Sequence, residues 1–227
     1  EHPEVVLVGT KTYECDMDDT VRLPRRDPDS YDSNSPITHC VDSEIAQVMA
    51  PFVPGTIMFR ASLVEKMGPY DGRLCYCGDM DFIARAALEG KIACLPDIDY
   101  VIRLLPTSIS SAGTMIQREI TGMIAGAYER TKRGEPREFT RDEVRRLEEL
   151  TEIRRKIPAT SSSKKIAFYH TRLSTLHRMN AKPLGALKHA FIAASFSPMN
   201  LAKDRKLQSN ILKSLAASIG LGAWVNY

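Results

Sequence analysis

The chain has 227 residues, of which 43% are hydrophobic, and its formal net charge is +3. This composition is ordinary for a globular protein with a buried core and argues against a disordered chain. No apolar run reaches the roughly 18 to 20 residues of a membrane-spanning helix, and the N-terminus lacks the basic and apolar segments of a signal peptide. We therefore expect a soluble chain. Its start without Met, directly on an apolar run, predicts that it is part of a longer protein.

The charge is distributed unevenly along the chain. Residues 1–113 contain 10 Lys and Arg against 18 Asp and Glu, whereas residues 114–227 contain 21 against 10, which gives net charges of −8 and +11. This difference predicts two domains, 1–113 and 114–227, with different surroundings. The basic domain would suit a polyanion, anionic lipid or an acidic neighbour, and a merely solvated basic surface is the simpler alternative.

The cysteines do not form a recognisable framework. There are five, Cys15, Cys40, Cys75, Cys77 and Cys94, an odd number with irregular spacing. This pattern favours a reducing, cytoplasmic location. Cys75 and Cys77 have a one-residue spacer and no second ligand pair, so they do not fit a zinc module.

The first domain consists of short apolar runs separated by turn residues. The predicted elements, in chain order, are a strand at Val5–Val8, an exposed charged segment at Cys15–Arg26, a loop at Tyr31–Pro36, a helix at Val41–Ala50, a strand at Thr56–Phe59, a helix at Leu63–Met67, a turn at Gly68–Gly72, a helix at Asp79–Leu88, and strands at Ile92–Leu95 and Tyr100–Leu104. After the helix at Asp79–Leu88, Gly90 stands where a left-handed C-terminal cap belongs.

The pattern after Gly113 is helical throughout. The predicted helices are Met115–Lys132, Thr140–Lys156, Lys164–Met179, Pro183–Ala194 and Leu201–Ile219. Thr140 and Glu143 have the spacing of a capping box, and a polar linker is predicted near residues 158–163. The apolar residues of the fourth helix predict a single stripe: Leu184, Leu187, Ala190 and Phe191.

One stretch, Leu74–Arg85, reads Leu-Cys-Tyr-Cys-Gly-Asp-Met-Asp-Phe-Ile-Ala-Arg and places two carboxylates at the start of an apolar helix. It follows the segment Pro54–Asp71 and precedes Gly90–Pro96 and Arg103–Ser110. In this order the blocks resemble the second half of a family 2 glycosyltransferase with a GT-A fold. The strength of the resemblance lies in the ordered spacing of the blocks.

The resemblance covers residues 1–113 well and 114–198 loosely. It implies an α/β fold: a partial GT-A unit, Rossmann-like with a mixed sheet, followed by an all-helical C-terminal region. It also implies that the nucleotide-binding strands and the paired-aspartate metal motif precede Glu1. The run Asp16–Asp19 superficially resembles that motif, but it lacks the apolar lead-in and is interpreted as a surface acidic turn.

The activity implied is transfer of a sugar from a nucleotide-sugar donor to the hydroxyl of a glycan or another acceptor. A divalent cation, Mg or Mn, is expected in the full-length enzyme, with ligands mostly outside this chain. By the resemblance, Asp79 is the general base of an inverting single displacement. The backbone N–H groups and dipole of a helix start stabilise a carboxylate there, although Asp is also common at helix starts simply as a cap.

Three further residues are predicted to bind substrate: Gly55, Asp81 and Arg103. Asp81 points away from Asp79 around the helix, so it would orient a loop or bind a sugar hydroxyl, and Arg85 has the spacing of an ordinary helical ion pair with it. Gly55 would let substrate approach the backbone closely, or would be a plain turn glycine.

Arg103 could neutralise diphosphate charge with its fork of donors, or could be an ordinary surface arginine. In the family pattern a His follows this Arg two positions later, and here that position is Leu105. Because Leu offers no lone pair, metal binding by this segment is in doubt.

Other functions are compatible with the sequence. The chain could be a non-catalytic module that binds glycan or a protein partner. The basic half, above all Leu201–Trp224, could instead contact a membrane surface or an assembly partner, at the inner face of the membrane for a cytoplasmic protein. Nucleic-acid binding is not favoured, because aromatic residues are sparse there. His170 and His177, seven residues apart, are expected to have packing or surface roles.

Overall fold

The computed structural model describes residues 2–24, 39–41, 53–108, 114–157, 163–197 and 205–218. Within these ranges the chain is mixed α/β, with a five-stranded sheet and helices. This agrees with the predicted class, whereas the finer GT-A assignment stays a prediction. The predicted loop at Tyr31–Pro36, most of the predicted helix at Val41–Ala50 and most of the polar linker lie outside the described residues.

The chain forms two compact units. Unit 1 comprises Glu1–Thr12, Arg25–Tyr100 and Gly113–Ile157, and unit 2 comprises Tyr13–Pro24, Val101–Ala112 and Pro158–Tyr227. The last boundary falls where the polar linker was predicted. The partition differs from the predicted domains 1–113 and 114–227, because two helices of the basic half pack into the core of unit 1.

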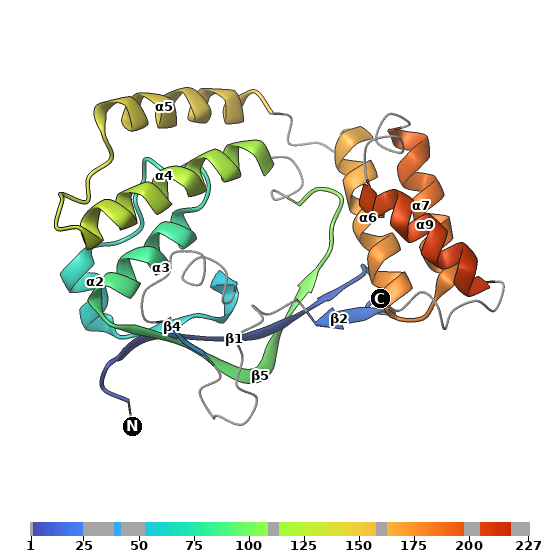
Figure 1. The fold of residues 1–227 in the computed structure, drawn as a ribbon, viewed down its shortest axis with the longest axis horizontal. Coiled ribbons are helices and arrows are strands. Elements are labelled where there is room, and N and C mark those ends of the chain that lie inside the picture. The colour runs from blue at the N-terminus through green and yellow to red at the C-terminus, as the bar shows by residue number, and fades with distance from the viewer. Residues whose placement is uncertain are drawn as a thin grey trace. The chain divides into compact units, whose positions relative to one another are not determined.

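The sheet contains β1 (Val5–Cys15), β2 (Arg22–Pro24), β3 (His39–Val41), β4 (Met58–Phe59) and β5 (Lys91–Arg103). Its strand order is β2-β1-β5-β3, and β4 also pairs with β1 (Figure 1). Leu7 pairs with Phe59, Glu14 with Leu23 and Cys40 with Ala93, all antiparallel. These pairings are antiparallel, whereas we expected a mixed sheet. β1 is longer than predicted because successive parts of it pair with β4 and then β2.

Several local predictions differ from the structure. The predicted strand at Thr56–Phe59 is a 3₁₀ turn, η1 (Pro54–Thr56), followed by the two residues of β4. The two strands predicted between residues 92 and 104 form one strand, β5. Gly90 is not a left-handed cap, since its φ of 171° is extended. A Cβ at Gly90 would lie 2.5 Å from Cγ1 of Val6 and 2.9 Å from the carbonyl oxygen of Glu4, so close packing requires the glycine.

Unit 1 is built in layers on its part of the sheet. Its helices are α2 (Ala61–Met67), α3 (Gly78–Glu89), α4 (Thr114–Lys132) and α5 (Arg141–Arg155). α3 lies over the sheet, α4 over α3 and α5 over α4 (Figure 1). The buried side chains that join these layers are Leu7, Ile92, Phe82, Ile83, Ile116, Ile120, Ile124, Leu147 and Leu150. This core fixes the position of α3, which carries the predicted base.

The predicted capping box at the start of α5 is confirmed. Oγ1 of Thr140 accepts the N–H of Glu143 at 3.2 Å, and the Glu143 carboxylate accepts the N–H of Thr140 at 2.8 Å. We expect Thr140→Ala to lower the free energy of unfolding by about 1 kcal/mol, because the backbone N–H of Glu143 loses its acceptor. Thr151→Ala is the matched control, since that hydroxyl donates only to the carbonyl of Leu147 within the same helix. Equal urea midpoints for the two variants would contradict the prediction.

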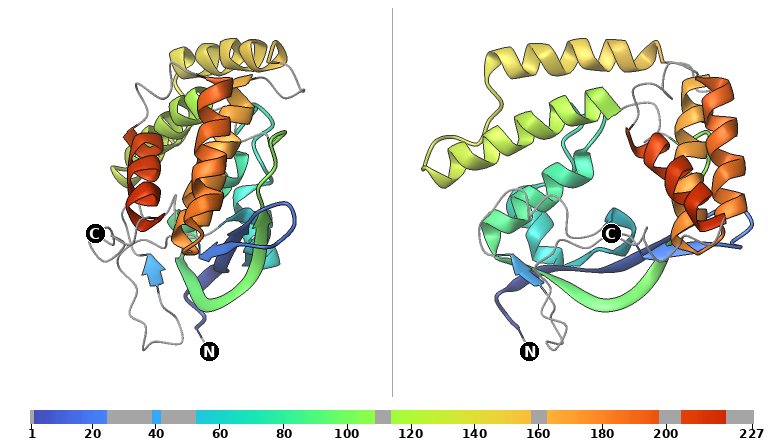
Figure 2. Two further views of the ribbon diagram at one scale, coloured as in Figure 1. Left: turned by 90° about the vertical axis from the view of Figure 1, so that its right-hand side faces the viewer. Right: turned by 45° about the vertical axis from the view of Figure 1, so that its right-hand side comes forward.

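Unit 2 contains the helices α6 (Ser163–Met179), α7 (Pro183–Phe196) and α9 (Arg205–Ser218), which pack on one another (Figure 2). Tyr169, Leu173 and Leu176 of α6 form a small core with Val21 and Leu104. The predicted apolar stripe of α7 is wrong in part. Ala190 is buried, but Leu184 and Phe191 are exposed. None of the described helices is both long and apolar enough to cross a membrane.

Candidate active site

Asp79 lies in the first turn of α3. The helix begins after Cys77, whose φ of 61° is in the left-handed region and whose side chain makes no capping hydrogen bond. Asp79 is half-buried, and its Oδ1 accepts the N–H of Met80 at 2.9 Å. Its Oδ2 makes no hydrogen bond or ion pair with any residue that the structure describes. One carboxylate oxygen is thus held by the helix start, and the other is available to a ligand.

Asp81, two residues further on, has a different environment. Its side chain is only 1% exposed, and both oxygens form ion pairs. Nε of Arg85 donates to Oδ2 at 2.9 Å, and Nη2 of Arg137 donates to Oδ1 at 2.5 Å. These contacts leave no exposed oxygen for a sugar hydroxyl in this structure, so they do not favour the predicted contact of Asp81 with substrate, which stays a prediction. The alternative, that it orients a loop, agrees with these contacts.

Arg85 connects Asp81 to the chain that follows α2. Its Nη1 donates to the carbonyl oxygens of Met67 at 2.7 Å and Gly68 at 3.0 Å, and its Nη2 donates to that of Pro69 at 2.7 Å. The guanidinium thus binds carbonyl oxygens at the end of α2 while it neutralises a buried carboxylate. The predicted helical ion pair is confirmed, and its role is structural.

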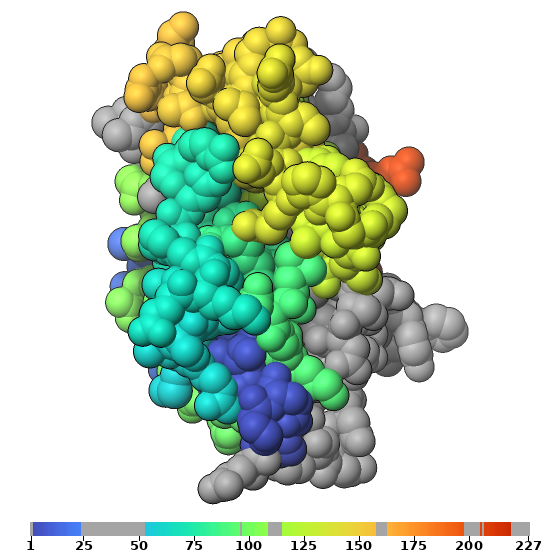
Figure 3. Space-filling model, turned by 90° about the vertical axis from the view of Figure 1, so that its left-hand side faces the viewer, coloured from blue at the N-terminus to red at the C-terminus, as the bar shows by residue number. Residues whose placement is uncertain are grey.

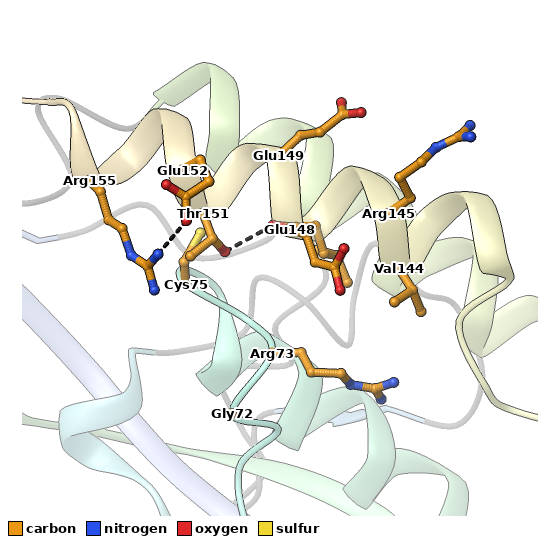
Figure 4. A pocket seen from close by; sticks show the side chains of 11 residues that line it. Gly72, Arg73, Cys75, Val144, Arg145, Glu148, Glu149, Thr151, Glu152 and Arg155 are labelled. Atoms are coloured by element: carbon orange, nitrogen blue, oxygen red, sulfur yellow. Dashed lines mark hydrogen bonds and ion pairs between the residues drawn. The ribbon is translucent and has the colours of Figure 1, made fainter.

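A hollow of about 600 Å³ lies between the loop Gly72–Cys75 and α5. Figure 3 shows α5 (yellow) above the segments of α2 and α3 in unit 1. Val144 and Glu148 point from α5 toward Arg73, whereas Arg145 and Glu149 point away from the loop (Figure 4). The residues that line it are Gly72, Arg73, Cys75, Val144, Arg145, Leu147, Glu148, Glu149, Thr151, Glu152 and Arg155. Its charged side chains have both signs, and Asp79 does not line it. No local sequence pattern predicts this hollow, because its walls are distant in the chain.

Gly55 lies in η1, next to an aromatic ring. A Cβ at this position would lie 2.6 Å from Cζ and 2.8 Å from Oη of Tyr100. The group that approaches this backbone closely is therefore the phenol of Tyr100 from β5. The structure thus shows a packing neighbour for this glycine, and its contact with substrate stays a prediction.

Arg103 ends β5 in unit 2, whereas Asp79 belongs to unit 1. Its guanidinium faces Cys15 and Asp19. Burial raises the pKa of the Cys15 thiol, and the neighbouring Arg103 acts in the opposite direction. A hydrogen bond from Arg22 lowers the pKa of Asp19, and the charge of Arg103 lowers it further. The positive charge of Arg103 is thus already near a carboxylate of its own unit.

The segment Asp16–Asp19 forms a turn, as predicted, but Asp16 is buried and not at the surface. Its Oδ1 accepts the N–H of Thr20 at 2.6 Å and that of Val21 at 3.3 Å. Burial by itself raises the pKa of Asp16, but these hydrogen bonds outweigh it, and the pKa is lowered. This carboxylate therefore shapes the turn.

No group of three His, Cys, Asp or Glu side chains within the described ranges is arranged to hold a metal ion. Four of the cysteines, Cys15, Cys75, Cys77 and Cys94, are free thiols. Sγ of Cys77 lies 3.6 Å from both the carbonyl oxygen of Gln117 and Oγ1 of Thr121, and burial raises the pKa of this thiol.

Three histidines gather between α6 and α7. The Nδ1 atoms of His170 and His189 lie 2.9 Å apart, and the centroid of the His189 ring lies 4.9 Å from that of His177. Since two unprotonated nitrogens cannot form a hydrogen bond, one of the paired Nδ1 atoms must donate its hydrogen to the other. Nδ1 of His177 is buried without a partner in the described structure, and a Cβ at Gly185 would lie 2.4 Å from it.

This cluster should make unit 2 sensitive to acid. Burial lowers the pKa of all three histidines, and in His189 the charges of His177, His170 and Lys188 lower it further, to about 4, against a small opposing effect of Asp16. Because the ordinary value is 6.5, the unfolded chain binds more protons between pH 6.5 and pH 4. Stability from this source is therefore present above pH 6.5 and lost as the pH falls.

We expect the free energy of unfolding to fall by roughly 2 kcal/mol between pH 6.5 and 4.5 from His189 alone. Denaturant unfolding at a series of pH values measures this slope. His189→Gln, which cannot titrate, should flatten it by the same amount, while acidic residues elsewhere contribute equally to both proteins. Identical slopes for the variant and the parent would contradict the prediction.

Comparisons with protein-family models, with curated proteins and with solved structures found no match. The resemblance to family 2 glycosyltransferases therefore stays a prediction from the sequence.

Proposed function

We propose that this chain is the acceptor-side part of a glycosyltransferase with a GT-A fold, which transfers a sugar from a nucleotide-sugar donor to an acceptor hydroxyl. The observation that carries the proposal is the contrast between two neighbouring carboxylates. Asp81 is buried and paired with two arginines, whereas Asp79 is half-buried and keeps one unbonded oxygen. A rigid, neutralised support beneath an available carboxylate suits a general base.

In this proposal Asp79 removes the proton of the acceptor hydroxyl as that oxygen attacks the anomeric carbon of the donor sugar. The bond from the sugar to the nucleoside diphosphate breaks in the same displacement, and the configuration at the anomeric carbon inverts. A Mg or Mn ion in the full-length enzyme would neutralise the departing diphosphate, with ligands mostly outside this chain. We also propose a cytoplasmic location, since the four described thiols are free.

The test is turnover of a panel of nucleotide sugars by the full-length protein, with and without acceptors, compared with Asp79→Asn. The proposal predicts that the substitution abolishes transfer. If the parent transfers sugar and the variant transfers it equally well, Asp79 is not the base. If the parent turns over no donor but binds glycan, the chain is a binding module and the proposed activity is wrong.

A further inference from the structure

Two helices of unit 2, α7 and α9, expose large apolar side chains. In α7, Ala186, Ala190 and Ala193 are fully buried, whereas Leu184 and Phe191 are 74% and 60% exposed. A helix of a globular domain ordinarily turns its largest apolar side chains inward. α7 does the reverse, and the apolar surface that it presents outward contributes nothing to packing on α6 and α9.

α9 also leaves large apolar side chains exposed, although its Leu207 is buried with Ala190 and Ala193 of α7. Asn210 and Ser214 are buried, whereas Leu212 and Leu215 are 67% and 45% exposed. The amide of Asn210 donates to Oγ1 of Thr175 on α6 at 2.8 Å and accepts from Nε of Arg178 at 3.1 Å. Polar contacts thus hold α9 to α6, and two leucines of α9 remain outside. Large apolar side chains thus remain exposed on two helices of one unit, and exposed apolar groups of this kind are typical of interaction surfaces.

The positive charge of the chain is concentrated in the C-terminal helical part of the same unit. Residues 163–218 contain ten Lys and Arg and a single acid, Asp204, whereas residues 114–162 contain eleven against nine acids. Lys188 lies on the exposed stripe of α7, four residues after Leu184 and three before Phe191, and its side chain is exposed. Apolar and cationic groups therefore occupy one helix face together.

We propose that α7 and α9 dock on the surface of an anionic lipid bilayer. Leucine and phenylalanine side chains would enter the boundary between headgroups and acyl chains, and Lys188 with its basic neighbours would pair with lipid phosphates. Each helix has 14 residues, fewer than the about 20 needed to span the hydrocarbon core. The helices would therefore lie along the surface.

The charge and the apolar side chains of α7 and α9 together distinguish three possible partners: a second copy of this chain, a nucleic acid and a lipid bilayer. A second copy of this chain would bring the same positive excess against itself, so self-association through this face is opposed electrostatically. A nucleic acid would pair with the lysines and leave Leu184 and Leu212 uncovered. An anionic bilayer satisfies both kinds of side chain. This inference is independent of the proposed sugar transfer, since binding is measured without donor or acceptor.

Co-sedimentation of the full chain with vesicles tests the proposal. One set of vesicles contains phosphatidylcholine alone, and the other contains phosphatidylcholine with phosphatidylglycerol. Binding should be strong with the anionic vesicles, weak with the neutral ones, and reduced by salt. Lys188→Glu should weaken binding about 25-fold, since the substitution changes the charge by two units and each charge near the surface contributes about five-fold. The matched control is Arg141→Glu, an exposed cation of unit 1.

The apolar contribution is tested by the double variant Leu184→Ser/Phe191→Ser, which should weaken binding by at least about ten-fold. Both side chains are exposed, so circular dichroism should show an intact fold. Met115→Ser changes an equally exposed apolar residue of α4 and should bind as the parent does. In addition, Phe191→Trp in a Trp224→Phe background should shift its emission to shorter wavelength when anionic vesicles are added.

Three results would overturn the proposal. The first is no binding to either kind of vesicle, and the second is equal binding to both. The third is full binding by the serine double variant together with competition by a soluble polyanion such as heparin. That last outcome would identify a surface for acidic macromolecules, in which the apolar side chains take no part.

Discussion

Replacing Asp79 with Asn should lower kcat for sugar transfer by about two to four orders of magnitude, the range expected when a general base is removed. Asparagine has nearly the same shape and can still accept the N–H of Met80, so α3 should begin at the same residue. What it cannot do is accept a proton from the acceptor hydroxyl. The expected loss is therefore in the chemical step, with little change in KM for the donor.

The matched control is Asp142→Asn. Asp142 is also in the first turn of its helix, α5, and its side chain is 87% exposed, so the substitution removes the same charge from an equivalent position. Both variants should unfold within about 1 kcal/mol of the parent, since neither side chain is fully buried and each substitution keeps the size of the side chain. Steady-state assays of the full-length protein should show a loss of transfer in Asp79→Asn alone. A parallel loss in both variants would indicate a general effect of charge.

The helices were predictable because their signals are local. The apolar period of 3.6 residues and the capping box at Thr140 both act within a few residues of the chain. α3, α4, α5, α6 and α7 accordingly begin and end close to their predicted bounds. β1 and β5 were predicted too short, since strand length depends on partners elsewhere in the chain.

The contacts that define the candidate site could not be predicted from local sequence patterns. Arg137 forms an ion pair with Asp81 although the two are 56 residues apart, and no sequence pattern near either residue predicts this pair. His189 completes the histidine cluster from a different helix than His170, and it becomes visible only once α6 and α7 are packed together. The net charge does change near residue 113. This change is a boundary in composition and not a boundary between the two units, because α4 and α5 belong to unit 1.

The exposed residues of α7 illustrate a further limit. A pattern of Leu184, Ala190 and Phe191 shows which helical positions are apolar, but it does not show which face turns inward. The alanines of α7 are buried where it packs against α6, because small side chains let helix backbones approach closely. The larger apolar side chains were left outside.

Asp81→Asn should destabilise the protein by about 3 to 5 kcal/mol, the range measured when one partner of a buried ion pair is removed. The substitution leaves the buried guanidinium of Arg85 without its counterion, although that group still binds the carbonyl oxygens of Met67, Gly68 and Pro69. Both the start of α3 and the turn after α2 should loosen. Urea unfolding, followed by circular dichroism, measures the change in free energy.

Two comparisons make this result specific. Glu152→Gln breaks the exposed pair with Arg155, whose side chains are 58% and 67% exposed, and should cost less than about 1 kcal/mol. Arg137→Gln should cost less than Asp81→Asn, because Asp81 keeps Arg85 and because Arg137 is partly exposed. If Asp81→Asn instead unfolded like the parent and raised KM for a sugar substrate, Asp81 would be a substrate ligand after all. The network would then not be the support on which Asp79 depends.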